Sequence, residues 1–218
     1  MLWDLRTEAE GLCLSGHRGW IHDVAFSPDG RLMASAGYDG TVKLWDIASG
    51  TEQVTLSGHC KAARCVVFSP DGTRLASGGI DRTVVIWDLA KAERTLTLDG
   101  YDDGIRSLAY SPDGSRLAVA AGDPPISILD AFTGGAVFIT GEGDSPIDAL
   151  AYSPGGELLA TGARDGKIRL LDAVSARPVF IIDGHDGGIT DLAFSPDGKK
   201  LATSDSEGVV KIWNFGGR

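Results

Sequence analysis

The sequence has few cysteines, no long apolar stretch and no recognisable leader. Three cysteines in 218 residues are too few for the disulfide framework of a small secreted protein. No segment approaches the roughly 18 consecutive apolar residues that a membrane-spanning helix requires. The first residues include Trp3, Asp4, Glu8 and Glu10 and lack the apolar core of a signal peptide. These absences predict a cytoplasmic protein that does not enter a membrane.

Basic residues are also in the minority. The chain has 20 lysines and arginines against 30 aspartates and glutamates, which gives a formal net charge of -10. Nucleic-acid binding requires a basic face that contacts phosphates, so this balance argues against a nucleic-acid partner. Many of the aspartates occupy turn positions of the repeat described below. The net charge alone therefore does not predict a basic partner.

Glycine, in contrast, is abundant. The chain has 30 glycines, and 43% of its residues are hydrophobic. This combination indicates many tight turns between short strands with a sizeable core. We expect residues 1–218 to form a single all-β domain.

Three short motifs recur with a common spacing of 42 residues. Trp-Asp or its variants stand at 3–4, 45–46, 87–88, 129–130, 171–172 and 213–214. The sequence SPDG, or SPGG in one copy, begins at residues 27, 69, 111, 153 and 195. Gly-His stands at 16–17, 58–59 and 184–185. A tandem period of this length is typical of repeat architectures.

Each repeat is predicted to contain four strands, which in the first complete copy cover residues 21–26, 32–37, 41–45 and 53–56. The SPDG motif between the first two has proline and glycine at positions that favour a tight turn. Asp39-Gly40 is a two-residue hairpin signal. No apolar period of 3.6 residues persists, which disfavours helical repeats. Four-stranded units of about 42 residues in tandem are the blades of a β-propeller.

The ordered motifs GH, SPDG, DG and WD resemble those of the WD-repeat propellers, and the resemblance covers essentially the whole chain. It implies an all-β propeller of five four-stranded antiparallel blades, which begin near residues 16, 58, 100, 142 and 184. We expect residues 1–15 to contain a fourth strand near Gly11 to Leu14 that latches the last blade. Because family propellers most often have seven blades, a fragment of a larger ring and an assembly of two chains remain alternatives.

The resemblance also implies buried tetrads of His, Ser or Thr, Asp and Trp. Complete sets are His17, Ser35, Asp39 and Trp45, and His59, Ser77, Asp81 and Trp87. Serine, histidine and aspartate together suggest a hydrolase, but their repetition in adjacent blades favours a structural network over a catalytic triad. The fifth repeat has His185, Thr203 and Trp213, with Glu207 at the aspartate position. The fourth retains Thr161 and Asp165, and the third replaces most of the set with apolar residues.

No cofactor or metal site is expected. Cys60 and Cys65 are separated by four residues, no CxxC motif occurs, and three of the four histidines belong to tetrads. The chain has no GxxxxGK[ST] phosphate loop. Once the repeat positions are removed, no acid–base set remains, so an enzyme is disfavoured.

The remaining candidates lie on the top face of the blades. In WD-repeat proteins, contact positions recur three and five residues after the Gly-His histidine and one residue before the hairpin aspartate. The large or charged residues at these positions are Trp20, His22, Tyr38, Arg64, Ile80, Arg106 and Arg164.

Trp, Tyr and Arg are enriched at interface hot spots. We therefore expect a protein or peptide partner with acidic and aromatic residues. Two alternatives remain open: Trp20 and Tyr38 cover a tetrad or fill space at the top of the ring, or the chain mainly self-associates or forms part of a larger propeller.

Overall fold

The computed structural model describes residues 3–4, 9–122, 126–140 and 145–215. All regular elements in these ranges are strands. No helix in the described part of the chain is long and apolar enough to cross a membrane. Asp123-Pro124-Pro125, the least regular predicted hairpin, lies outside the described residues.

Five sheets follow one another along the chain. Blade 1 contains β3 (Ile21–Phe26), β4 (Leu32–Gly37), β5 (Thr41–Asp46) and β6 (Glu52–Ser57). Blade 2 contains β7 (Ala63–Phe68), β8 (Arg74–Gly79), β9 (Val84–Asp88) and β10 (Glu93–Leu98). Blade 3 contains β11 (Ile105–Tyr110), β12 (Arg116–Ala121), β13 (Ile126–Asp130) and β14 (Ala136–Thr140).

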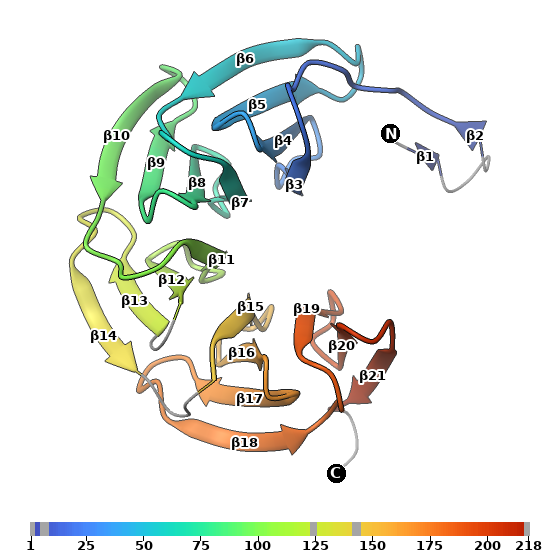
Figure 1. Ribbon diagram of the computed structural model, residues 1–218, viewed down its shortest axis with the longest axis vertical. Coiled ribbons are helices and arrows are strands. Elements are labelled where there is room, and N and C mark those ends of the chain that lie inside the picture. The colour runs from blue at the N-terminus through green and yellow to red at the C-terminus, as the bar shows by residue number, and fades with distance from the viewer. Residues whose placement is uncertain (1–2, 5–8, 123–125, 141–144, 216–218) are drawn as a thin grey trace.

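Blade 4 contains β15 (Ile147–Tyr152), β16 (Leu158–Ala163), β17 (Lys167–Asp172) and β18 (Pro178–Asp183). Blade 5 has three strands, β19 (Ile189–Phe194), β20 (Lys200–Asp205) and β21 (Val210–Asn214). Neighbouring strands in every blade are antiparallel. The first strand of each blade lies near the centre of the arc, and the fourth strand of blades 1 to 4 lies at its outer rim (Figure 1). The predicted propeller architecture is confirmed.

The SPDG motif explains why each first strand turns sharply into the second. In blade 1 the Ser27 hydroxyl donates to Asp29 Oδ1 at 2.6 Å, and the Gly30 amide donates to the Ser27 carbonyl at 2.9 Å. Gly30 has a φ of 70°, which glycine adopts without steric cost. The same backbone turn recurs in the other blades, although blade 4 has Gly155 in place of the aspartate.

The core lies between blades. Val42 and Leu44 of blade 1, for example, pack in one cluster with Val66, Phe68 and Trp87 of blade 2. Burial of such apolar surface contributes roughly 25 cal/mol per Å². A blade therefore requires a neighbour on each side to bury both of its apolar faces.

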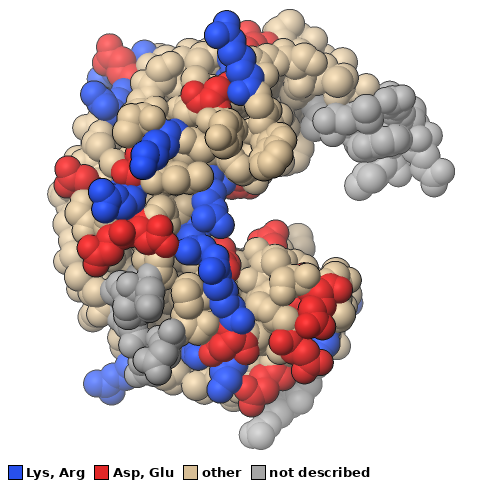
Figure 2. Space-filling view, viewed as in Figure 1, with Lys and Arg blue, Asp and Glu red and all other residues tan. Residues whose placement is uncertain are grey.

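The five blades form an open arc, and blades 1 and 5 stand at its two ends (Figures 1 and 2). Apolar side chains at these ends are accordingly exposed, among them Ile21 and Phe26 of blade 1 and Val210 and Ile212 of blade 5. The ends of the arc thus display faces of the kind that are buried between internal blades.

The expected latch on the last blade is not formed, and that expectation is corrected. Glu10 of β2 (Ala9–Glu10) pairs with Trp3 of β1 (Trp3–Asp4), in the same register in which Glu52 pairs with Trp45. Residues 11–14 contain no strand, and within the described part of the chain β21 pairs only with β20. The amino-terminal pair therefore has the geometry of the outer strands of its own repeat, directly before blade 1, and does not complete blade 5.

Candidate functional site

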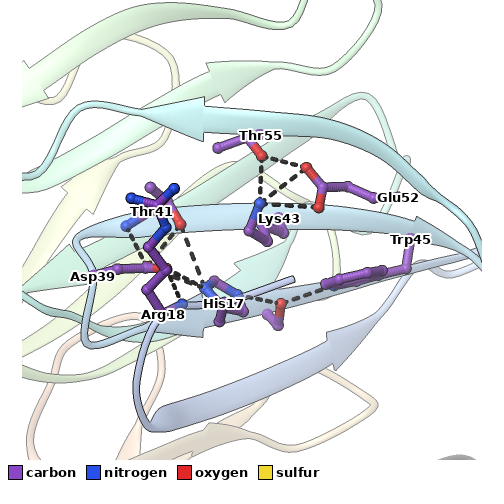
Figure 3. A network of polar contacts seen from close by, with 9 residues as sticks. His17, Arg18, Asp39, Thr41, Lys43, Trp45, Glu52 and Thr55 are labelled. Carbon is purple, nitrogen blue, oxygen red and sulfur yellow. Dashed lines mark hydrogen bonds and ion pairs between the residues drawn. The ribbon is translucent and has the colours of Figure 1, made fainter. Parts of the chain in front are cut away.

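The blade 1 tetrad is a continuous chain of hydrogen bonds (Figure 3). Trp45 Nε1 donates to Ser35 Oγ at 2.8 Å, and Ser35 Oγ lies 2.7 Å from His17 Nε2. His17 Nδ1 lies 3.1 Å from Asp39 Oδ1. An ionised carboxylate only accepts, so Nδ1 carries the proton and Nε2 accepts from the serine hydroxyl.

Blade 2 repeats this network with His59, Ser77, Asp81 and Trp87. The corresponding distances are 3.0 Å from His59 Nδ1 to Asp81 Oδ1, 2.8 Å from Nε2 to Ser77 Oγ, and 2.9 Å from Trp87 Nε1 to Ser77 Oγ. Ser77, like its counterpart Ser35, is fully buried, and its hydroxyl contacts an indole on one side and an imidazole on the other. A hydroxyl so enclosed is inaccessible to a substrate, and this favours the structural role over a catalytic one.

The tetrad aspartates are held in the ionised form. Burial acts to raise the pKa of Asp39, but hydrogen bonds from the Arg18 amide, the Thr41 hydroxyl and His17 outweigh it and hold the pKa well below its usual range. Burial likewise acts to raise the pKa of Asp81. The hydrogen bond from the Cys60 amide and the interaction with His59 outweigh it, so the pKa of Asp81 is lowered. Each aspartate thereby also ties the loop after its histidine to the hairpin.

Blade 5 contains a third complete network, and the sequence assignment of its acid is wrong. His185 Nδ1 lies 2.7 Å from Asp205 Oδ2, and Glu207 is not the partner. His185 Nε2 lies 2.7 Å from Thr203 Oγ1, which accepts from Trp213 Nε1 at 2.9 Å. Asp205 stands two residues before the hairpin position.

Glycines explain how the acid can occupy either position. Asp205 corresponds to Gly37 and Gly79 of the first two blades. A Cβ at Gly37 would lie 2.3 Å from His17 Nδ1 and 2.7 Å from Asp39 Oδ1. The two positions thus reach the same nitrogen from different sides, and a carboxylate at one requires a small residue or a displaced side chain at the other.

Blades 3 and 4 lack the network. In blade 3, the positions of the serine and the tryptophan hold Val119 and Leu129, both buried in an apolar cluster against which Tyr101 packs. In blade 4 the buried Thr161 hydroxyl has no hydrogen-bond partner among the described residues, and Asp165 pairs instead with Arg169 at 2.9 Å. The polar tetrad is therefore a property of blades 1, 2 and 5.

A second polar cluster lies beside the blade 1 tetrad and was missed by the sequence analysis. Lys43 Nζ donates to Glu52 Oε2 at 2.9 Å and to Thr55 Oγ1 at 2.7 Å, and the Thr55 hydroxyl donates to Glu52 (Figure 3). Cross-strand pairing of β5 and β6 brings these residues together. The alternation of charged and apolar residues along both strands is the signal that identifies such a pair.

The top face of blade 1 carries an exposed aromatic cluster. Trp20 is 78% exposed and Tyr38 61% exposed, and their ring centroids lie 6.4 Å apart. The exposed His22 lies 6.3 Å from the Tyr38 ring. The Tyr38 amide donates to the Trp20 carbonyl at 2.8 Å, which fixes the two loops together. Most of the Trp20 side chain and of the Tyr38 side chain is therefore in contact with solvent.

The arginines of the top face are largely neutralised. Arg106 pairs with Asp103 and Asp148, each at 2.9 Å, and Arg164 pairs with Asp148 at 2.7 Å. Arg64 forms no ion pair with any residue that the structure describes. Of the three arginines, Arg64 is therefore the one whose charge no described carboxylate neutralises.

A polar cavity of about 440 Å³ opens at the centre of the arc. It is lined by His22, Asp23, Arg64, Cys65, Arg106, Ser107, Leu108, Asp148, Thr190 and Asp191. Ile80, the remaining predicted contact residue, is partly exposed in the hairpin loop of blade 2, where its amide donates to the Ala62 carbonyl at 2.9 Å. Of the predicted contact residues, His22, Arg64 and Arg106 thus line the cavity, and Trp20, Tyr38, Ile80 and Arg164 lie outside its lining.

No group of three or more potential ligands in the described part of the chain is arranged to hold a metal ion. Cys13, Cys60 and Cys65 are all free thiols. Burial raises the pKa of the Cys65 thiol far above its usual range, which makes it unreactive.

Comparison with known proteins agrees with the architecture. The sequence profile of a family described as IFT122 first beta-propeller matches residues 20–218. A stretch of 43 residues is 46% identical to Coronin-7 of Mus musculus and covers 20% of this chain and 5% of that protein. The second match has the length of one repeat and spans only a small part of that relative.

Proposed function

The chain belongs to the WD-repeat propeller family described as IFT122 first beta-propeller, and from that premise we propose that it is a non-enzymatic module that docks a protein or peptide on the top face of blades 1 and 2. The free thiols further support the proposal that it acts in the cytoplasm. Neither a nucleic acid nor a membrane is proposed as a partner.

The exposed aromatic cluster is the observation that carries this proposal. Tryptophan buries a large area when it binds, and a Trp that is 78% exposed beside an exposed Tyr offers a rigid anchor with little loss of conformational entropy. Gly19 supports the pair, since it has a φ of 127° and lies against Tyr38. The loop geometry therefore holds both rings on the surface.

The arginines indicate which charge the proposed ligand should have. Arg64 borders the cavity and lacks an ion-pair partner among the described residues, so it is available to a carboxylate or to an aromatic face. Asp148 already neutralises Arg106 and Arg164 in part. We therefore propose a ligand with one aromatic or apolar anchor and one acidic residue, and its binding should weaken with added salt.

Partner capture with the wild-type protein, from a lysate or from a peptide library, tests this proposal. Trp20→Ala combined with Arg64→Ala should reduce the affinity for the recovered ligand by about 30-fold or more, as expected for loss of a central anchor. Ser206→Ala, on the top face of blade 5 and outside the cavity lining, is the control. Unchanged affinity in the first variant, at an unchanged melting temperature, would place the site elsewhere.

A second candidate function is that the chain forms part of a larger propeller. Its support is a hydrogen bond that links successive blades: Asp23 Oδ2 accepts from the Val66 amide of the next blade at 2.9 Å. In blade 5 the equivalent Asp191 accepts from its own Leu192 amide, as Asp23 does from Val24, and accepts no bond from another blade within the described residues. Together with the exposed β21, this arrangement suits the addition of further blades of the same type.

A labelled peptide of residues 50–57, which contains the outer strand of blade 1, serves as a surrogate fourth strand for blade 5. Saturable binding that is lost in Ile212→Lys and absent with a scrambled peptide would support the second candidate. Absence of binding to the wild-type chain would count against it.

A further inference from the structure

The outer strands of the four complete blades differ sharply in polarity. β6 and β10 are rich in polar residues, with the sequences EQVTLS and ERTLTL. β14 and β18 read AVFIT and PVFIID. All four occupy the same place at the rim of the arc (Figure 1). The apolar character of β14 and β18 is therefore not a requirement of the fold.

Equivalent residues show the contrast directly. Thr97 of β10 pairs with Val85, and Ile181 of β18 pairs with Arg169 at the corresponding place. Ile181 is 55% exposed and the adjacent Phe180 is 61% exposed. Large apolar side chains exposed in succession on one strand mark an interaction surface more often than a solvated one.

β18 also has an unprotected backbone edge. It pairs with β17 on one side, and within the described residues no strand pairs with its other side. Edge strands are usually protected by charged residues or proline along their length. Pro178 stands at the first position of β18, and from Val179 to Ile182 the strand has neither a charge nor a proline, whereas β10 has Glu93 and Arg94 in its first two positions.

The charges that flank β18 are complementary under a two-fold axis. Arg177 precedes the strand and Asp183 ends it, and both are exposed. They lie three residues before and three residues after Phe180. Antiparallel pairing of two copies centred on Phe180 would therefore set Arg177 of each copy opposite Asp183 of the other. Opposite charges and aromatic pairs in such cross-strand positions are both favourable.

We propose that β18 pairs antiparallel with β18 of a second copy of this chain, and that the two blades then form one continuous eight-stranded sheet. The contact is isologous, since each copy offers the same surface to the other. A second copy is the occupant because the strand is complementary to itself in both charge and apolar character. The surface lies at the rim, away from the top face, and does not depend on the proposed ligand site.

Sedimentation equilibrium tests the proposal. The wild-type chain should show a monomer–dimer equilibrium, and Ile181→Lys should weaken dimerisation by about tenfold or more, because it places two like charges in the apolar centre. Thr97→Lys, the same change at the equivalent position of blade 2, is the control and should leave the equilibrium unchanged. A monomeric wild-type protein at about 0.1 mM would overturn the proposal.

A charge exchange makes the register testable. Arg177→Asp and Asp183→Arg should each weaken the dimer, and the double variant should restore it, since the opposed pairs are then reversed. Asp183 also lies 3.5 Å from Lys167, so its removal alone is not decisive and the restoration is the informative measurement. Val210→Lys at the open end of blade 5 separates this contact from association through the arc ends. Dimers that dissociate with Val210→Lys and persist with Ile181→Lys would contradict the proposal.

Discussion

His185 Nδ1 lies 2.7 Å from Asp205 Oδ2, although Asp205 stands two residues before the position from which Asp39 reaches His17. The Asp205 carboxylate also accepts from the Val209 and Glu207 amides at 2.9 and 3.0 Å, and these bonds, with His185, lower the pKa of Asp205. Asp205, the last residue of β20, thus holds both His185 and the hairpin of blade 5 in place.

We predict that Asp205→Ala destabilises the protein markedly, whereas Glu207→Ala has little effect. The first change leaves the buried His185 nitrogen and two hairpin amides without their acceptor, at a cost of roughly 1–3 kcal/mol for each unsatisfied buried group. The Glu207 side chain is exposed. Chemical denaturation of both variants measures the difference, and a larger loss for Glu207→Ala would contradict the observed network.

His59→Ala should lower the melting temperature more than Tyr101→Ala does. Loss of His59 leaves the buried Ser77 hydroxyl without its acceptor and Asp81 without its imidazole donor, whereas Tyr101 contacts a cluster that contains the apolar Val119 and Leu129. The second change should mainly remove packing. Differential scanning calorimetry of the two variants provides the comparison, and equal or reversed losses would count against a stabilising tetrad.

Asp148→Asn should be more costly than Asp103→Asn. The Asp148 side chain is 17% exposed and joins Arg106 to Arg164, while Asp103 is 57% exposed and pairs with one arginine, Arg106. A mostly buried charge that loses its partner costs about 1–3 kcal/mol, but an exposed pair typically contributes less than about 1 kcal/mol. Urea unfolding of the two isosteric variants tests the order.

Asp23 should make the protein less stable as the pH rises towards neutrality. Burial, opposed by the Val66 and Val24 amides and assisted by the negative charge of Asp191, raises the pKa of Asp23 from 3.8 to about 6. The folded state therefore binds a proton more readily than the unfolded chain. The free energy of unfolding should fall between these two values as the pH increases, by at most about 1.4 kcal/mol per pH unit from this group.

Asp23→Asn removes this contribution and keeps an oxygen that can accept from the Val66 amide. The difference in unfolding free energy between the wild type and Asp23→Asn should therefore change across this interval and be constant above it. Denaturation at several pH values from about 4 to 8 measures this difference. A difference that does not vary with pH would show that the carboxyl titrates normally.

The repeat, the strands and most of the tetrads could be predicted from the amino-acid sequence. Turn chemistry at SPDG and Asp39-Gly40 is local, so it sets the strand ends wherever it occurs. The 42-residue spacing then places His17, Ser35 and Trp45 on neighbouring strands of one sheet. Family resemblance identified their mutual bonds, and the repeated pattern indicated their structural role.

Other contacts could not be predicted, because they join residues that are distant in sequence and are brought together only by the packing of strands and blades. In blade 5, Asp205 takes the role that Asp39 has in blade 1. It can do so because a side chain at its position, which is Gly37 in blade 1, lies close to the histidine. The ion pair of Arg164 with Asp148 joins the hairpin loop of blade 4 to β15, and the pair of Asp148 with Arg106 crosses into blade 3. The open arc likewise depends on the packing of whole blades: β2 pairs with β1 of its own repeat, so the register that the repeat encodes leaves β21 without a fourth strand from the described part of this chain.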